Sequence, residues 1–271
     1  MSHMPRPASR HTITIAIALL AMAVLALPAV AMAEPEATSA FSRIATSFRN
    51  NIIVENRYLI ILDGLKTTII ISVFATLFGT LLGALVCFMR MSPNPLPSAL
   101  AKAYISLLRG TPLLVFLMLM FYVVFAAVDI DPIIVSVIAF GMNFAAYVAE
   151  IYRAGINSIE RGQTEAGIAM GFTKVQTFRF IILPQTIQRI VPVYKGEFIS
   201  LVKMTSVVGY IAVQDLTKAG DIIRSRTFDA FFPLVMVAIL YFFISWLLTL
   251  SLEFIERATN PRSKHKQVTT A

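Results

Sequence analysis

The sequence predicts an all-α membrane protein with five core transmembrane helices, a signal-like hydrophobic segment before them and a two-helix cytoplasmic loop between them. Of the 271 residues, 57% are hydrophobic and only 14% are charged, whereas soluble domains are typically about 25% charged. The apolar residues gather in segments of membrane-spanning length. The positive residues lie near the ends of these segments, so the net charge of +8 indicates a positive-inside topology and not a nucleic-acid partner.

The N-terminal 33 residues have the features of a secretory signal. Arg6 and Arg10 precede an apolar run over 13–30, and Ala-Met-Ala at 31–33 matches a small-residue cleavage site. An uncleaved extra transmembrane helix is the alternative, because the apolar run approaches spanning length. Both interpretations place the polar segment 34–57 in the periplasm.

Five hydrophobic segments follow and define a transmembrane domain over 58–256. Their approximate ranges are 65–89, 104–128, 133–152, 190–213 and 231–254. A proline-rich breaker at 92–97, an acidic turn at 129–132 and a polar connection at 214–230 separate some of them. In the first segment Gly79 and Gly83 are four residues apart, a spacing that permits close helix contact in a membrane.

The distribution of charge predicts the orientation of these segments. Lysines and arginines lie on the two connections that would face the cytoplasm and on the basic tail 257–271, whereas Asp129 and Asp131 make the intervening turn acidic. The positive-inside rule then places the C-terminus and the loop 157–186 in the cytoplasm.

The first half of the loop 157–186 predicts a short helix that ends in a tight turn. Ala166, Ala169 and Met170 fall at helical spacing and share one face. Gly171 follows them at the position where a helix end favours a residue that tolerates positive φ.

The second half of the loop predicts another helix. Thr173 and Gln176 have the spacing of a capping box, which starts a helix by satisfying its first free N–H groups. We expect this helix to end near Leu183-Pro184, because proline cannot continue the hydrogen-bond ladder.

The third hydrophobic segment carries a polar stripe. Asn143, Tyr147 and Glu150 lie at i, i+4 and i+7, on one helix face. These side chains are candidates for contact with a polar solute that crosses the membrane. The alternatives are structural: Glu150 forms an intrahelical pair with Arg153, and Asn143 holds two helices together.

The fourth hydrophobic segment carries a cation near its middle. Lys203 there costs roughly 3 kcal/mol on insertion scales unless it faces a cavity or a partner. Together with the hydroxyls of Thr205 and Ser206, it would offer donors to the carboxylate of a zwitterionic solute. Glu150 or Glu197 would accept hydrogen bonds from the ammonium group of the same solute.

The second hydrophobic segment contains Arg109-Gly110-Thr111-Pro112 near its start. Glycine and proline together loosen the helical ladder, which predicts a kink. A helix start with an interfacial arginine is the alternative.

Some kinds of site are missing from the sequence. The single cysteine, Cys87, lies in an apolar run, and no Cys/His cluster has metal-ligand spacing. The chain has no G-x-x-x-x-G-K-[ST] phosphate loop and no Ser/His or His-Glu-x-x-His constellation. We therefore expect no metal, no ATP site and no enzyme activity in this chain.

The loop also carries a resemblance to a known family. Glu165-Ala166-Gly167, then Gly171, then Leu183-Pro184, are similar to the E-A-A coupling loop of the permease subunits of type I ABC importers. Gly167 stands where this family usually has alanine, which predicts a less rigid first helix.

Further motifs resemble the polar amino-acid branch of these permeases, which carries solutes such as histidine, glutamine and arginine. They are the segments 108–112, 143–150 and 197–206, with sequences LRGTP, NFAAYVAE and EFISLVKMTS. Arg226-Thr227-Phe228 also fits this branch. Together with the loop motif, these make five matches in the right order on the right sides of the membrane.

The resemblance implies the function and the partners. The chain would be a multi-pass permease of the bacterial inner membrane that imports a polar amino acid by alternating access. A cytoplasmic ATP-binding subunit would bind ATP, so the permease itself needs no cofactor. A second permease, identical or related, and a periplasmic solute-binding protein would complete the importer. The alternative function is an ion-gradient-driven secondary transporter.

Overall fold

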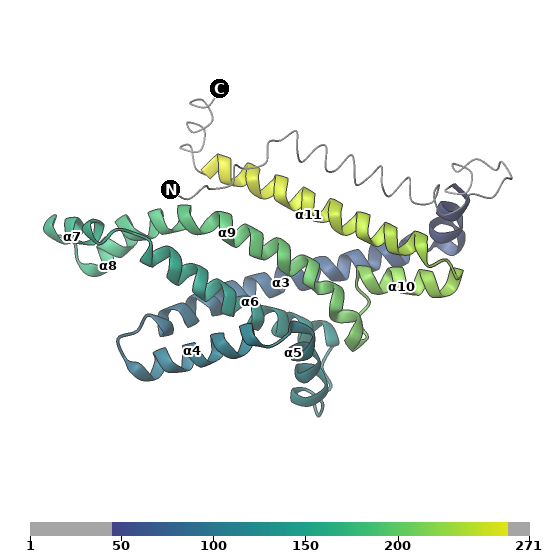
Figure 1. The fold of residues 1–271 in the computed structure, drawn as a ribbon, viewed down its shortest axis with the longest axis horizontal. Helices are drawn as coiled ribbons and strands as arrows, with labels where there is room; N and C mark the ends of the chain where they lie inside the picture. The colour runs from purple at the N-terminus through teal and green to yellow at the C-terminus, as the bar shows by residue number, and fades with distance from the viewer. Residues whose placement is uncertain (1–44, 260–271) are drawn as a thin grey trace, which may run out of the picture.

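The computed structural model describes residues 45–259, and almost all of them are helical (Figure 1). Three helices are long and apolar enough to cross a membrane: α3 (Tyr58–Arg90), α6 (Pro132–Asn157) and α11 (Phe231–Thr259). Two bent pairs of helices pass the same test when each pair is taken as one span, which raises the number of spans to as many as five. The all-α prediction is confirmed for the described residues, none of which forms a strand.

The first bent pair joins α4 (Pro95–Gly110) to α5 (Leu113–Leu119) and η3 (Met120–Val124), and the two halves differ in direction by 108°. The helix begins nine residues before the predicted segment because the Asn94 side chain accepts a hydrogen bond from the Leu96 amide at 3.1 Å. Pro95 fits the first helical position, where no backbone donor is needed. The prediction of one span over 104–128 is therefore wrong about its start and its continuity.

The second bent pair joins α9 (Leu183–Met204) and η5 (Thr205–Ile211) to α10 (Leu216–Thr227), with a bend of 51°. The predicted polar connection 214–230 is thus mostly a helix. Asp215 starts α10 by accepting hydrogen bonds from the amides of Thr217 and Lys218 at 3.0 and 2.9 Å. Leu216, Ala219 and Ile223 form a fully buried stripe at helical spacing.

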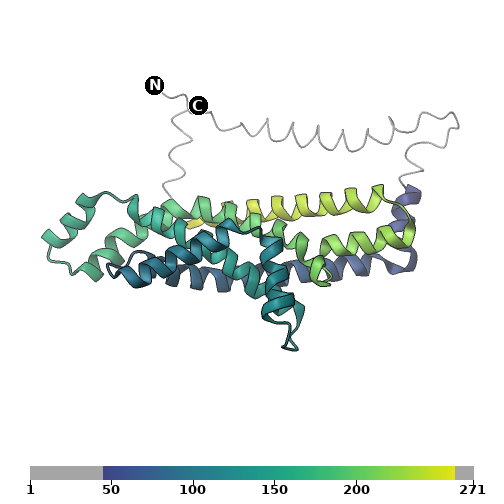
Figure 2. The same ribbon diagram turned by 60° about the horizontal axis from the view of Figure 1, so that its bottom comes forward.

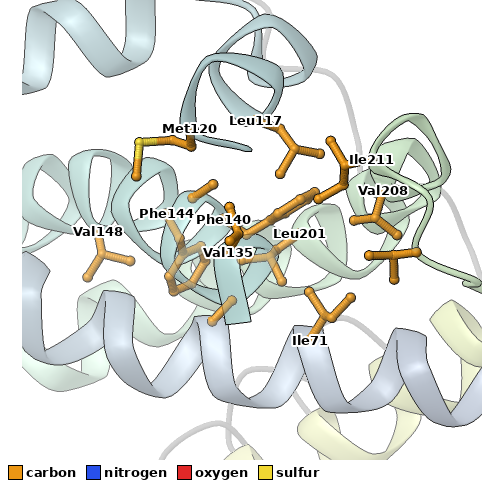
Figure 3. Close-up of a cluster of buried hydrophobic side chains, with 13 residues drawn as sticks. Ile71, Leu117, Met120, Val135, Phe140, Phe144, Val148, Leu201, Val208 and Ile211 are labelled. Carbon is orange, nitrogen blue, oxygen red and sulfur yellow. The ribbon is translucent and has the colours of Figure 1, made fainter. Parts of the chain in front are cut away.

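The core lies where α3 packs on α6. A Cβ added to Gly79 would lie 2.6 Å from the carbonyl oxygen of Gly141, and one added to Gly83 would lie 2.9 Å from the Val148 side chain. The predicted close contact at this pair of glycines is therefore confirmed. Figure 3 shows the adjoining cluster, in which α3, α5, α6 and η5 contribute Ile71, Leu117, Phe140, Val208 and Ile211.

The molecule is elongated, with different helices at its two ends (Figures 1 and 2). Helices α7 (Arg161–Ala169) and α8 (Lys174–Thr177) form one end, and η4 (Phe178–Ile182) connects α8 to α9. Helix α10 and the first turns of α3 and α11 form the other end. In Figure 2 the α5–η3 segment projects from the side of the body.

The segment before α3 is attached to the α10 end. It contains η1 (Arg49–Ile53) and η2 (Val54–Asn56). The buried Asn51 side chain donates to Asp229 at 2.9 Å and accepts from the Thr227 hydroxyl at 2.9 Å. The predicted signal segment 1–33 and nearly all of the basic tail lie outside the described residues.

Candidate functional site: a polar groove and a coupling loop

A groove with a volume of about 590 Å³ lies between α4, α6 and α9. Arg109 at the end of α4, Tyr147 on α6 and Glu197 on α9 line one end of it. Arg189 and Ser158 line the end nearer α7, where Arg189 donates to the Ser158 carbonyl. The lining between them comprises Glu150, Ile151, Ala154, Gly155, Ile190 and Val193.

Arg109 reaches the groove because α4 stops beside it. Thr111 is extended, with φ −103° and ψ 132°, as expected for a residue that precedes proline. Helix α4 therefore ends at Gly110 and α5 starts at Leu113 after a bend of 108°, so the predicted kink is a complete break between two helices. The Arg109 guanidinium lies 5.0 Å from the centre of the Tyr147 ring, a cation–π contact.

Asn143 holds α6 to the end of α4. Its buried side-chain amide donates to the Leu108 carbonyl at 3.0 Å, which is the helix-joining contact that the sequence left open as an alternative. Asn143 also lines a cavity of about 10 Å³ next to the groove. Glu197 lines that cavity too. The other lining residues are apolar: Leu113, Phe140, Phe144, Leu201 and Met204.

The two carboxylates of the groove have different surroundings. Glu150 accepts from Arg153 at 2.6 Å, and Arg90 lies 3.9 Å from it. Glu197 is half-buried and lines both the groove and the small cavity. Among the described side chains, no ion pair within 4.0 Å involves Glu197 or Arg109.

The donors predicted on the fourth segment lie away from the groove. Lys203 occupies the last turn of α9 and is exposed, and it lines neither cavity. The buried Thr205 hydroxyl donates to the Val202 carbonyl at 2.7 Å. Ser206 is half-buried in η5. The structure thus brings together Tyr147, Glu150 and Glu197, with Asn143 beside them and Lys203 apart.

The loop at the opposite end from α10 has the predicted local geometry. Gly171 adopts φ +86° after α7. The Thr173 hydroxyl accepts from the Gln176 amide at 3.3 Å, and the Gln176 side chain accepts from the Thr173 amide at 2.8 Å. The turn and the capping box are therefore confirmed.

The second loop helix does not end at Leu183-Pro184, so that prediction is wrong. The π turn η4 runs directly into α9, and Pro184 occupies the first turn of α9. A proline is tolerated there because the first N–H groups of a helix have no intrahelical acceptor. The loop 157–186 is consequently continuous with α9, which lines the groove.

Gly167 packs closely against the second loop helix. A Cβ at this position would lie 2.6 Å from Cγ2 of Thr177 and 3.0 Å from Cδ1 of Ile181. Gly167 is the buried residue of α7. The glycine lowers the helix propensity of α7, as the sequence predicted, and it allows α7 to pack closely on the second loop helix.

The outer surface of the loop is accessible and carries polar and apolar side chains. Glu165, Ala166 and Ala169 are exposed. Larger apolar side chains lie around them, with exposed fractions of 66% for Met170 and 75% for Val175.

Two basic residues of α9 were not singled out as site candidates by the sequence. Arg189 lines the groove, and Lys195 forms an ion pair with Glu256 that joins α9 to α11. Lys195 lies eight residues before Lys203 in the same hydrophobic segment. Its position inside that segment was the available signal.

Comparison with known proteins identifies the family. Residues 75–265 match the model described as binding-protein-dependent transport system inner membrane component. The glutamine transport system permease protein of Escherichia coli (strain K12) is 33% identical over 201 residues, which cover 73% of this chain and 92% of that protein. The L-cystine transport system permease protein of Bacillus subtilis (strain 168) is 35% identical over 216 residues, which cover 79% and 92%.

Solved structures agree with these sequence matches. An amino acid ABC transporter with histidines has 35% identity and a TM-score of 0.69 over 74% of this chain and 94% of that chain. The MetNI methionine ABC transporter shares the fold, with 21% identity and a TM-score of 0.58 over the same shares.

The matches favour an ABC importer over an ion-gradient-driven transporter. Such an importer pairs its inner-membrane permease with a separate ATP-binding subunit, so ATP hydrolysis belongs to that partner. The multi-pass, apolar helices described above fit this role. The chain belongs to the family of binding-protein-dependent transport system inner membrane components, the permease subunits of ABC importers.

Proposed function

We propose that this permease imports a polar amino acid from the periplasm, together with a second permease, a periplasmic solute-binding protein and a cytoplasmic ATP-binding subunit. The names of the glutamine and L-cystine permeases support an amino acid as the solute. ATP would bind to the partner subunit, since the sequence has no phosphate loop.

The main support for this proposal is the pair of opposite charges that line one end of the groove. Arg109 and Glu197 line the same end of it with opposite charges, and no opposite charge lies within 4.0 Å of either among the described side chains. A charged group inside a membrane helix is costly unless it has a partner. The carboxylate and ammonium groups of an amino acid would supply both partners at once, so a zwitterion fits this end of the groove.

The orientation and the coupling follow from the same elements. Five spans with the C-terminus and the α7–α8 loop in the cytoplasm would satisfy the positive-inside rule. The ATP-binding subunit would then contact the loop around Glu165 and Gly171. Because η4 continues into α9, a rigid-body movement of the loop would reach Glu197 through one continuous helical element.

Uptake by the reconstituted importer tests the proposal. Arg109→Met should lower ATP-dependent uptake of labelled L-glutamine at least about tenfold, because a charged hydrogen bond to the substrate carboxylate contributes about 1.5–3 kcal/mol. Lys203→Met serves as the matched variant, since Lys203 lies outside the groove. Capture of the ATP-binding subunit should be unchanged in both variants.

Either variant can contradict the proposed site. Undiminished uptake by Arg109→Met would exclude Arg109 from the substrate path. A loss of uptake confined to Lys203→Met would move the site to the last turn of α9.

A further inference from the structure

The groove contains one carboxylate whose charge is already balanced. Glu150 lies one helical turn from Tyr147 toward the α7 end of the molecule. Arg153 binds it with two nitrogens, Nη2 at 2.6 Å from one oxygen and Nε at 3.1 and 3.2 Å from both. Nε of Arg90 on α3 lies 3.9 Å from the same carboxylate.

The two arginines act from outside the groove. Neither Arg153 nor Arg90 lines it, whereas Glu150 does. All three side chains are only partly exposed, with 32%, 27% and 22% of their surfaces accessible. Their mutual attraction is therefore weakly screened compared with that of a surface pair.

We call the end of the groove that Arg109, Tyr147 and Glu197 line its deep end. The charged groups there are consequently one cation and one anion. Arg109 and Glu197 are the charged groups there that have no ion pair among the described side chains. Arg189 lies at the other end, is exposed, and donates to the Ser158 carbonyl. A zwitterionic backbone would use both deep charges and leave none for the side chain of the substrate.

We propose that Arg153, assisted by Arg90, sets the charge class of the substrate by neutralising Glu150, so that the groove accepts amino acids with uncharged side chains. This inference rests on the proposed function of the groove. Without Arg153, Glu150 would keep only the more distant Arg90, 3.9 Å away. Its carboxylate would then be largely unbalanced one turn, about 5.4 Å, from the ring that lies against Arg109. The ammonium group of a lysine side chain would then find an acceptor inside the groove.

Equilibrium binding to the purified permease–ATPase complex, without binding protein, tests this inference. Labelled L-glutamine, L-lysine and L-glutamate are compared at equal concentrations. The unsubstituted complex should bind L-glutamine best. Arg153→Met should raise the lysine-to-glutamine binding ratio by about tenfold, which corresponds to about 1.4 kcal/mol.

Further variants separate an effect of charge from a structural effect. Adding Glu150→Gln to Arg153→Met should return the ratio to its original value, because the released carboxylate is then absent. Arg224→Met is the matched control, since Arg224 forms an i,i+3 pair with Asp221 at 2.5 Å on α10, outside the groove. It should leave the ratio unchanged. If Arg153→Met gives too little folded complex, Arg90→Met tests the same balance from α3.

The outcomes distinguish this inference from the proposed function. If the Arg153→Met and Arg90→Met complexes both bind L-glutamine normally and keep the lysine-to-glutamine ratio of the unsubstituted complex, the inference is overturned. The groove would then remain the substrate site. A complex that binds none of the three amino acids would overturn both. A higher lysine ratio that persists after Glu150→Gln is added would overturn the role of Glu150.

Discussion

The two ends of this permease are both helical, but the α10 helix and the α7–α8 loop differ in how far they bury their apolar side chains. At the α10 end, Leu216, Ala219 and Ile223 are completely buried against α3 and α11. At the α7–α8 end, Met170 and Val175 are 66% and 75% exposed. The α10 stripe is therefore packed within this chain, although Phe228 just after it is 94% exposed. The α7–α8 end presents apolar side chains that this chain does not cover. The predictions below change one end at a time, from the largest expected effect to the smallest.

The largest effect is expected where α3 and α10 touch backbone to backbone. A Cβ at Gly64 would lie 2.6 Å from the carbonyl oxygen of Asp215 and 2.9 Å from Cβ of Ala219. Gly64→Val should lower the free energy of unfolding by about 3 kcal/mol, measured by thermal unfolding in detergent. Gly196→Val is the control, because nothing lies within 4 Å of a Cβ there. Equal melting temperatures would contradict tight packing at the α10 end.

The next effect concerns the buried cap of α10. Asp215 is completely buried and accepts from two backbone amides and from the Tyr241 hydroxyl at 3.1 Å. Asp215→Ala should cost about 2 kcal/mol, because it removes the cap and leaves buried donors unsatisfied. Tyr241→Phe removes one of these bonds and should cost about 1 kcal/mol. The same thermal unfolding assay ranks the two, and the reverse ranking would show that Asp215 is not the centre of this contact.

The same contrast explains which features could be predicted from the sequence. The turn at Gly171 and the capping box of Thr173 and Gln176 depend on residues three or four positions apart, so local spacing was sufficient. Helix α10 was missed because its charged residues outnumber its apolar stripe. It packs on α3, which is distant in sequence, and on α11, which follows it.

The groove likewise combines a feature that local spacing predicts with one that depends on distant parts of the chain. The face with Tyr147 and Glu150 follows from helical periodicity and was predicted. The presence of Arg109 opposite that face depends on where α4 stops and on the 108° turn that follows. No local pattern gives the size of such a turn. Pro184 was likewise misjudged because the π turn before it allows the helix to continue.

At the α7–α8 end, the expected effect is on partner binding more than on stability. Gly171 has φ +86°, which costs a β-branched residue about 1–2 kcal/mol. Gly171→Val should therefore distort the turn and reduce capture of the ATP-binding subunit in a pull-down. Gly171→Asn should retain capture, since asparagine tolerates this conformation. Equal capture by all three proteins would show that the turn is not needed for docking.

The smallest effect on stability and the sharpest test of the comparison come from Val175. Val175→Ser should change the free energy of unfolding by less than about 0.5 kcal/mol, because the side chain is 75% exposed and makes few contacts. Capture of the ATP-binding subunit should nevertheless fall. Leu81→Ser is matched in exposure, also 75%, but lies on α3 in a membrane span. If both variants reduced capture equally, exposed apolar surface would have the same meaning everywhere on this chain. If only Val175→Ser does so, the surface of the α7–α8 end is specific to its partner.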